Sequence, residues 1–252
     1  MNFLLRFSGV AVLLLFLGLG ASAFATDTGF SAKVYEDSKK EKLLFTYKQE
    51  AEEKGGTRIL MNTFIDAADG SVAAVETVEF ATTGQGEVFR RYHVKQNQIN
   101  AEGTIEVKDG KAHFTYTKDG KTKTASEKAG DNFVVGSSAL PYLRKHWDKI
   151  VKGEKVAVRL GVVDRLESVG FEFVREREIE RDGQKVYVLK MKPSSFIIAA
   201  LVNPLYWYVS ADGQKLLEIN GRSQVKRKVD GQWKDFDAVT VYEYGSAGGN
   251  SK

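Results

Sequence analysis

Alternation of apolar and polar residues is the dominant pattern along the chain. Between Ile99 and Val107 every second residue is apolar or small and the residues between are polar or charged, and the pattern returns over residues 112–117. Such period-two alternation is typical of half-buried antiparallel strands. Ten other segments have a similar character, so about a dozen strands are predicted, the others at 43–52, 57–66, 72–81, 87–95, 155–163, 167–181, 184–192, 205–211, 215–222 and 236–244.

Asp-Gly is a recurring dipeptide between these segments. It occurs six times, at 69–70, 109–110, 119–120, 182–183, 212–213 and 230–231. Tight hairpin turns require positive φ, which Gly and Asp tolerate better than other residues. The dipeptides therefore predict short hairpin connections and an antiparallel sheet.

Two segments depart from the strand pattern. Apolar residues recur at helical spacing over 138–152, with Pro141 in the first turn, and the apolar run 194–202 ends at Asn203-Pro204. A dozen strands do not lie in one flat sheet. We therefore predict a mainly β fold, with a curved antiparallel sheet (a half-barrel or barrel-like) and one or two short covering helices.

The first 25 residues have the character of an export signal. Arg6 is followed by an unbroken apolar run over 10–20 and then by the small residues around Ala23 and Ala25. This succession is typical of a cleavable secretory signal peptide. We expect a signal peptide at 1–25, a single β-rich domain at 26–244, a disordered tail at 245–252, and a location in the periplasm or outside the cell.

Charge and composition exclude several classes of protein. After position 25 the net charge is +3 and the basic residues are spread along the chain, which argues against nucleic acid as a partner. Cysteine is absent, which excludes disulfides, thiolate metal sites and a lipid-modified cysteine. No integral membrane span is expected once the signal is removed.

Candidate catalytic chemistry is sparse. Of three histidines, His93 and His113 lie on predicted strands, and His146 lies on the predicted helix near Ser137 and Ser138. These serines lack the G-x-S-x-G elbow of a hydrolase and fit helix caps better. No metal-binding motif occurs, so we expect neither a metal nor a cofactor, and we assign no catalytic residue.

The segment 171–181 is a candidate ligand-binding strand. If it is one continuous strand, Phe171, Phe173, Arg175 and Arg177 share a face. An apolar floor beside a cationic rim would suit an amphiphile with an anionic head group. The simpler interpretation is a long strand with solvated ends, and the length of the hairpin loop that follows stays open between two and three residues.

No charged residue occurs between Ser194 and Ala211. Asn203-Pro204 interrupts this stretch, so a short helix followed by a strand is more consistent with it than a membrane helix. Such a segment is either ordinary core or the lid and wall of an apolar cavity. We include Phe196, Ile197 and Trp207 with the preceding four residues as the candidate ligand-binding set.

The second half also carries a resemblance, in the segments RLESVGFEF (165–173), MKPSS (191–195), LVNPL (201–205) and LLEINGR (216–222). Their succession resembles uncharacterised secreted β-rich proteins of Gram-negative bacteria. The plan is remotely similar to the periplasmic lipoprotein-carrier (half-barrel) superfamily. That resemblance implies a curved sheet that holds acyl chains in its concave face, but no local motif transfers the carriers' functional residues to this chain.

The combined interpretation is a periplasmic or secreted non-catalytic protein. We expect it to bind an apolar or amphiphilic envelope component, such as a lipid, an acyl chain or a lipoprotein. Two alternatives stay open, a hydrolase of envelope polymers and a protein–protein interaction module of the cell envelope.

Overall fold

One large sheet dominates the computed structural model, which describes residues 29–84, 86–200 and 202–245. Neighbouring strands follow the order β8-β7-β6-β5-β4-β3-β2-β1-β17-β14-β13-β12-β11-β10-β9. The bounds are β1 Phe30–Tyr35, β2 Leu43–Lys54, β3 Thr57–Asp66, β4 Val72–Thr83, β5 Gly86–Gln96, β6 Ala101–Lys108, β7 Lys111–Lys118, β8 Lys121–Lys128, β9 Phe133–Val134, β10 Val156–Val162, β11 Glu167–Arg181, β12 Gln184–Pro193, β13 Leu205–Ser210, β14 Leu216–Arg222 and β17 Asp237–Tyr244. The predicted curved, mainly antiparallel sheet is confirmed, with β9 and β10 as a parallel pair.

Short hairpins connect most neighbouring strands, as the Asp-Gly pairs predicted. Both residues have positive φ in four of the six pairs, at 109–110, 119–120, 182–183 and 230–231. The turn at 182–183 joins Arg181 directly to its partner Gln184, so the loop has two residues. In the other two pairs only the glycine has positive φ.

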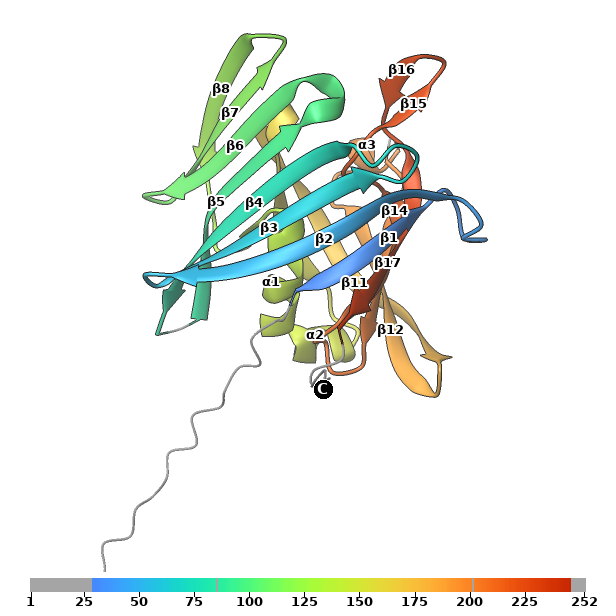
Figure 1. Cartoon of the computed structure of the whole chain (residues 1–252). Helices are drawn as coiled ribbons and strands as arrows, with labels where there is room; N and C mark the ends of the chain where they lie inside the picture. The colour runs from blue at the N-terminus through green and yellow to red at the C-terminus, as the bar shows by residue number, and fades with distance from the viewer. Residues whose placement is uncertain (1–28, 85, 201, 246–252) are drawn as a thin grey trace, which may run out of the picture.

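The sheet curls until its two ends approach each other (Figure 1). Glu127 on β8 accepts hydrogen bonds from the backbone N–H of Ser168 on β11, at 3.1 Å, and from its hydroxyl. A Cβ added at Gly103 on β6 would lie 2.6 Å from Val163, in the 3-10 turn η3 (Val163–Arg165) between β10 and β11. The described sheet nevertheless ends at β8 and β9 without pairing them, so it is barrel-like but not closed.

The strands β12 and β14 both end at the same end of the sheet, which we call the upper end (Figure 1). We call the opposite end the lower end. Residues 133–151, the lower insertion, comprise β9, the 3-10 turn η2 (Gly136–Ser138), and the helices α1 (Ala139–Lys145) and α2 (Trp147–Val151). The helix predicted over 138–152 is thus divided at His146, where φ is −117°. Leu143 and Ile150 are fully buried against β10–β14.

A second segment extends from the upper end into the interior of the curled sheet. Residues 223–236, the strap, join β14 to β17 and carry the small hairpin of β15 (Arg227–Val229) and β16 (Gln232–Lys234). Val225 is buried in a cluster with residues of β1–β4. A Cβ added at Gly136 in the lower insertion would lie 2.6 Å from Gln224 Nε2, so the two segments meet inside the curled sheet.

The remaining helix, α3 (Phe196–Ala199), lies in the connection between β12 and β13 at the upper end (Figure 1). It is shorter than the predicted helix at 194–202. The predicted signal peptide at 1–25 and residues 246–252 of the predicted tail lie outside the described residues. Among the helices of the described chain, none has the length and apolar character needed to cross a bilayer.

Candidate functional site

Three of the predicted ligand-binding residues lie in the protein core. Phe173 is fully buried, Phe171 and Trp207 nearly so, and the rings of Phe173 and Trp207 meet edge to face with centroids 5.2 Å apart. Leu143 and Ile150 of the lower insertion belong to the same cluster. The concave face is therefore occupied here by the protein's own side chains, and a ligand would reach these rings only if the lower insertion moved.

The two predicted arginines are separated by a β-bulge. Arg175 pairs in register with Leu189 and Arg177 with Val188, so Glu176 is an extra residue in β11. One extra residue reverses the alternation, which places Arg175 and Arg177 on opposite faces. The interpretation of 171–181 as one uninterrupted face was therefore wrong beyond Arg175.

Each arginine has local partners. The Arg175 guanidinium lies over the Tyr187 ring at 5.4 Å, and its Nη1 is 3.9 Å from Glu178. Arg177 pairs with Glu176 at 2.7 Å. The two side chains do not converge on a common point, so they form no shared anion site in this conformation.

Phe196 and Ile197 are the most exposed large apolar side chains recorded in the described chain, at 90% and 75% exposure. Their neighbour Ile198 packs against the core, and the backbone N–H of Ser194 donates to Gly170 O at 2.9 Å. The base of this connection is fixed while its tip projects outward. We call Phe196 and Ile197 the apolar apex.

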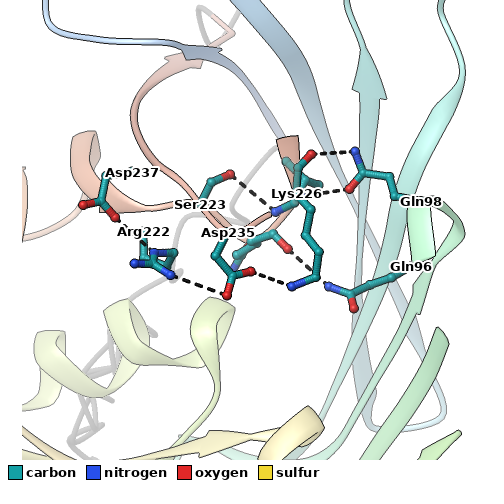
Figure 2. Close-up of polar contacts among 9 residues, drawn as sticks. Gln96, Gln98, Arg222, Ser223, Lys226, Asp235 and Asp237 are labelled. Atoms are coloured by element: carbon teal, nitrogen blue, oxygen red, sulfur yellow. Dashed lines mark hydrogen bonds and ion pairs between the residues drawn. The ribbon is translucent and has the colours of Figure 1, made fainter. Parts of the chain in front are cut away.

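Polar contacts hold the strap across the upper end (Figure 2). Gln98, beyond the end of β5, exchanges two hydrogen bonds with the Lys226 backbone, both of 2.8 Å. Lys226 Nζ lies 2.5 Å from Asp235, and Arg222 Nε lies 3.0 Å from Asp237. The strap thereby links β14 and β17 to the β5–β6 turn on the other side of the curled sheet.

The connection that carries the apolar apex contacts β17 just after the strap ends. Asn203 Nδ2 donates to Asp237 Oδ2 at 3.2 Å, so the connection that carries α3 contacts the start of β17. In the hairpin β15–β16, Lys228 and Trp233 face each other in register, with Lys228 Nζ 5.7 Å from the ring centroid. Trp233 is 36% exposed. The upper end therefore carries both the apolar apex and a hairpin with an accessible tryptophan.

A polar cluster lies inside the curled sheet. Asn62 accepts a hydrogen bond from Gln49 at 2.9 Å and donates to Ser137 of the lower insertion at 2.8 Å. Tyr92 donates to the Glu76 carboxylate at 2.8 Å, and Asn62 Nδ2 lies 3.4 Å from its other oxygen. These five residues, which we call the interior polar cluster, connect the lower insertion to β2–β5.

Burial controls the protonation of this cluster. It raises the pKa of the Glu76 carboxyl, and the hydrogen bonds from Tyr92 and Asn62 oppose that shift in part. Burial also raises the pKa of Tyr92 well above its ordinary value, with a further contribution from the Glu76 charge. The side chains of the cluster hydrogen-bond to one another, and these hydrogen bonds hold the lower insertion against the sheet.

Reactive groups do not assemble elsewhere in the described residues. His93 lies 2.7 Å from Glu102 near the surface, and burial with nearby lysines lowers the pKa of His146. Ser138 bonds the backbone of Val135 as a capping group. Within the described ranges, no group of three His, Asp or Glu side chains is placed to hold a metal ion.

The sequence interpretation did not single out the hairpin β15–β16. Its segment Lys226–Asp235 holds four basic and two acidic residues around Asp230-Gly231, with Trp233 beside Lys234. A tryptophan between lysines in a tight hairpin was the available signal. Only the fold places that hairpin at the same end of the sheet as Phe196 and Ile197.

Comparison with protein-family models and with curated proteins finds no match. Among solved structures, the chain is similar to a beta-barrel-like protein of domain of unknown function DUF1849 from Brucella abortus, with a TM-score of 0.48 and 9% identity over 87% of this chain and 97% of that one. It is also similar to a DUF1329 family protein from Desulfovibrio piger, with a TM-score of 0.28 and 12% identity over 88% of this chain and 85% of that one.

Proposed function

We propose that this protein is an exported, non-catalytic binding protein for an apolar or amphiphilic envelope component, such as a lipid, an acyl chain or a lipoprotein. The observation that carries the proposal is the apolar apex. Phe196 and Ile197 project from an uncharged connection whose base is fixed to the core. We assign the contact to this apex because its side chains are accessible without any rearrangement of the protein.

The exposure of this pair is costly in water. Burying a large apolar side chain is worth about 1.5–3 kcal/mol, so the pair would contribute about 3–6 kcal/mol when covered. Single exposed apolar residues are ordinary on protein surfaces, whereas two adjacent large ones on a projecting tip indicate contact with another apolar surface. The gain on covering them is large enough to support reversible binding.

The direct test is partition of the protein into uncharged phosphatidylcholine vesicles, measured by flotation. The protein is recovered after export, with its N-terminus determined by mass spectrometry, and lipids extracted from it are identified in the same way. We expect binding by the wild type. Replacing Phe196 and Ile197 together by serine should weaken binding about 100-fold or more, because the pair's transfer free energy is lost.

A matched control removes two other exposed apolar side chains. Met61 on β3 and Val88 on β5 are 39% and 43% exposed. The double change Met61→Ser with Val88→Ser should leave partition within about 2-fold of the wild type, since neither lies on a projecting tip. A protein that binds no vesicle and carries no extractable lipid, or loss of binding in the control alone, would contradict the proposal.

Uptake of a ligand into the curled sheet is a second form of the same function. Trp207 Nε1 is buried and has no hydrogen-bond partner among the described residues, so a polar atom of a ligand could satisfy it. The contacts would then be Phe171, Phe173 and Trp207, with the lower insertion displaced and Arg175 or Arg177 at the rim. Trp207→Phe removes the N–H but retains an aromatic ring, and it should reduce the amount of extractable lipid only if this route is used.

A further inference from the structure

The upper end combines an apolar tip with a basic hairpin, and we propose that it docks on the surface of a bilayer that contains anionic lipids. Phe196 and Ile197 insert among the acyl chains, while Lys228, Trp233 and Lys234 lie at the head groups. This inference rests on the function proposed above and names its ligand: an anionic membrane surface rather than any apolar compound.

The position of the two features follows from strand topology. β12 ends at Pro193 and β14 ends at Arg222, and both pair antiparallel with β13 between them. The connection that carries α3 and the connection that carries β15–β16 therefore leave the sheet at the same end. Figure 1 shows α3 and the hairpin at this upper end, with the ends of β1 and β17 that lead to the termini on the opposite side.

The hairpin supplies charge complementarity to an anionic surface. Residues 226–235 carry a net charge of +2. Lys226 is paired with Asp235 and Arg227 with Glu36, which leaves Lys228 and Lys234 without a carboxylate partner among the described residues. Basic side chains next to the membrane interact with anionic head groups over about one Debye length.

The order of residue types fits an interfacial site. Aliphatic and phenyl side chains favour the acyl region, whereas tryptophan favours the boundary with the head groups and lysine keeps its ammonium group in water. Phe196 and Ile197 are the most exposed apolar residues, Trp233 is partly exposed, and Lys228 lies across its ring. A protein partner would also cover the apex but would not require all three types in this arrangement.

The test compares vesicles of phosphatidylcholine alone with vesicles that also contain about 30% phosphatidylglycerol, at ionic strengths of about 0.05 and 0.5 M. All proteins are recovered after export and share one N-terminus, so its contribution cancels between variants. We expect tighter binding to the anionic vesicles, and weaker binding at the higher ionic strength.

Charge reversal locates the contact. Each lysine near an anionic surface contributes about 5-fold to binding, so Lys228→Glu with Lys234→Glu should weaken binding to anionic vesicles about 25-fold or more. The control is Lys108→Glu with Lys111→Glu, which changes two exposed lysines around the Asp109-Gly110 hairpin at the lower end. This control should bind within about 3-fold of the wild type, because only its long-range charge differs.

Tryptophan fluorescence provides an independent readout. Lipids with brominated acyl chains should quench Trp233, and Trp233→Phe should abolish the quenching, because Trp207 is buried in the core and Trp147 lies on α2 in the lower insertion. Far-ultraviolet circular dichroism confirms that each variant is folded before its binding is compared.

The outcomes separate the two proposals. Equal binding to both kinds of vesicle with no dependence on salt would overturn the anionic surface while leaving apolar binding by the apex intact. Equal loss in both charge-reversal pairs would overturn the hairpin's role. Absence of binding to either vesicle, with the apex needed only to capture a protein that carries no lipid, would overturn both the inference and the proposed function.

Discussion

The two helical segments of the chain, α1–α2 and α3, differ sharply in what covers them. Leu143 and Ile150 in the first are fully buried, whereas Phe196 and Ile197 in the second are 90% and 75% exposed. The lower insertion lies against the concave face of the sheet, while α3 lies beyond the ends of β12 and β13, with only Ile198 packed on the core. An apolar helix is thus covered only where the sheet curves around it.

Truncating one apolar side chain in each segment should give the largest difference in the free energy of unfolding. Leu143→Ala is expected to lower the free energy of unfolding by about 2–5 kcal/mol, because it leaves a cavity among buried neighbours. Phe196→Ala is expected to change it by less than about 0.5 kcal/mol, because the ring is already solvated. Urea unfolding of both variants measures the contrast, and equal losses would show that the two segments are packed alike.

A glycine substitution should next test how tightly the lower insertion is seated. Gly213, in the β13–β14 turn, has a φ of +74°, and an added Cβ would lie 2.5 Å from the Trp147 ring of α2. Gly213→Ala should cost about 2 kcal/mol or more, since strain in the turn adds to the clash.

The matched control for this change is Gly231→Ala in the β15–β16 turn. Gly231 has a similar φ of +77° but open space around its Cβ position, so only the strain of about 1 kcal/mol remains. Thermal unfolding of the two variants compares the sites. If both lose the same stability, then Trp147 can move aside freely and the insertion is less tightly seated than its contacts indicate.

The interior polar cluster, which contacts the buried lower insertion, predicts that the free energy of unfolding depends on pH. Burial raises the pKa of Glu76 above the ordinary value of 4.5, so the folded protein holds this proton more tightly than the unfolded chain. Stability from this group is therefore fully present below pH 4.5 and is lost as pH rises through the raised pKa. Glu76→Gln, which does not ionise, should lose less stability than the wild type as pH rises above 4.5, and urea unfolding at a series of pH values measures the difference.

Tyr92→Phe should change the pH dependence of stability in a different way from Glu76→Gln. The Tyr92 hydrogen bond opposes the rise in the Glu76 pKa, so its removal should shift the loss of stability to higher pH. Phe196→Ser, far from the cluster in the fold, should leave the pH profile unchanged. Identical profiles for the wild type and Glu76→Gln would show that folding does not raise the pKa of the Glu76 carboxyl.

Much of the strand pattern could be predicted from sequence because half-buried strands impose alternation residue by residue. The predictions at 57–66 and 167–181 coincide with β3 and β11. The strands β1, β8, β9, β15 and β16 were missed. β9, β15 and β16 have only two or three residues and β1 has six, whereas β8 lies at the edge of the sheet with nearly all its residues exposed and is polar on both faces. Alternation is lost where neither face meets a core.

The candidate site was predicted only in part. The uncharged segment that contains Phe196 and Ile197 was identified from the sequence, but the same signal also predicted a place in the core for it. The grouping of Arg175 with Arg177 failed because a bulge at Glu176 depends on pairing with β12, which leaves no mark in the spacing of β11 itself. The hairpin around Trp233 became a candidate only because the fold places it at the same end of the sheet as α3.

The chain itself determines where strands alternate and where Asp-Gly turns reverse direction, because both depend on residues close together in sequence. The tertiary structure decides which apolar residues are covered. Leu143 and Phe196 are alike as local signals, yet the curvature of a sheet assembled from distant strands encloses one and leaves the other in solvent. Burial is a property of the whole surface around a side chain, so no local pattern determines it.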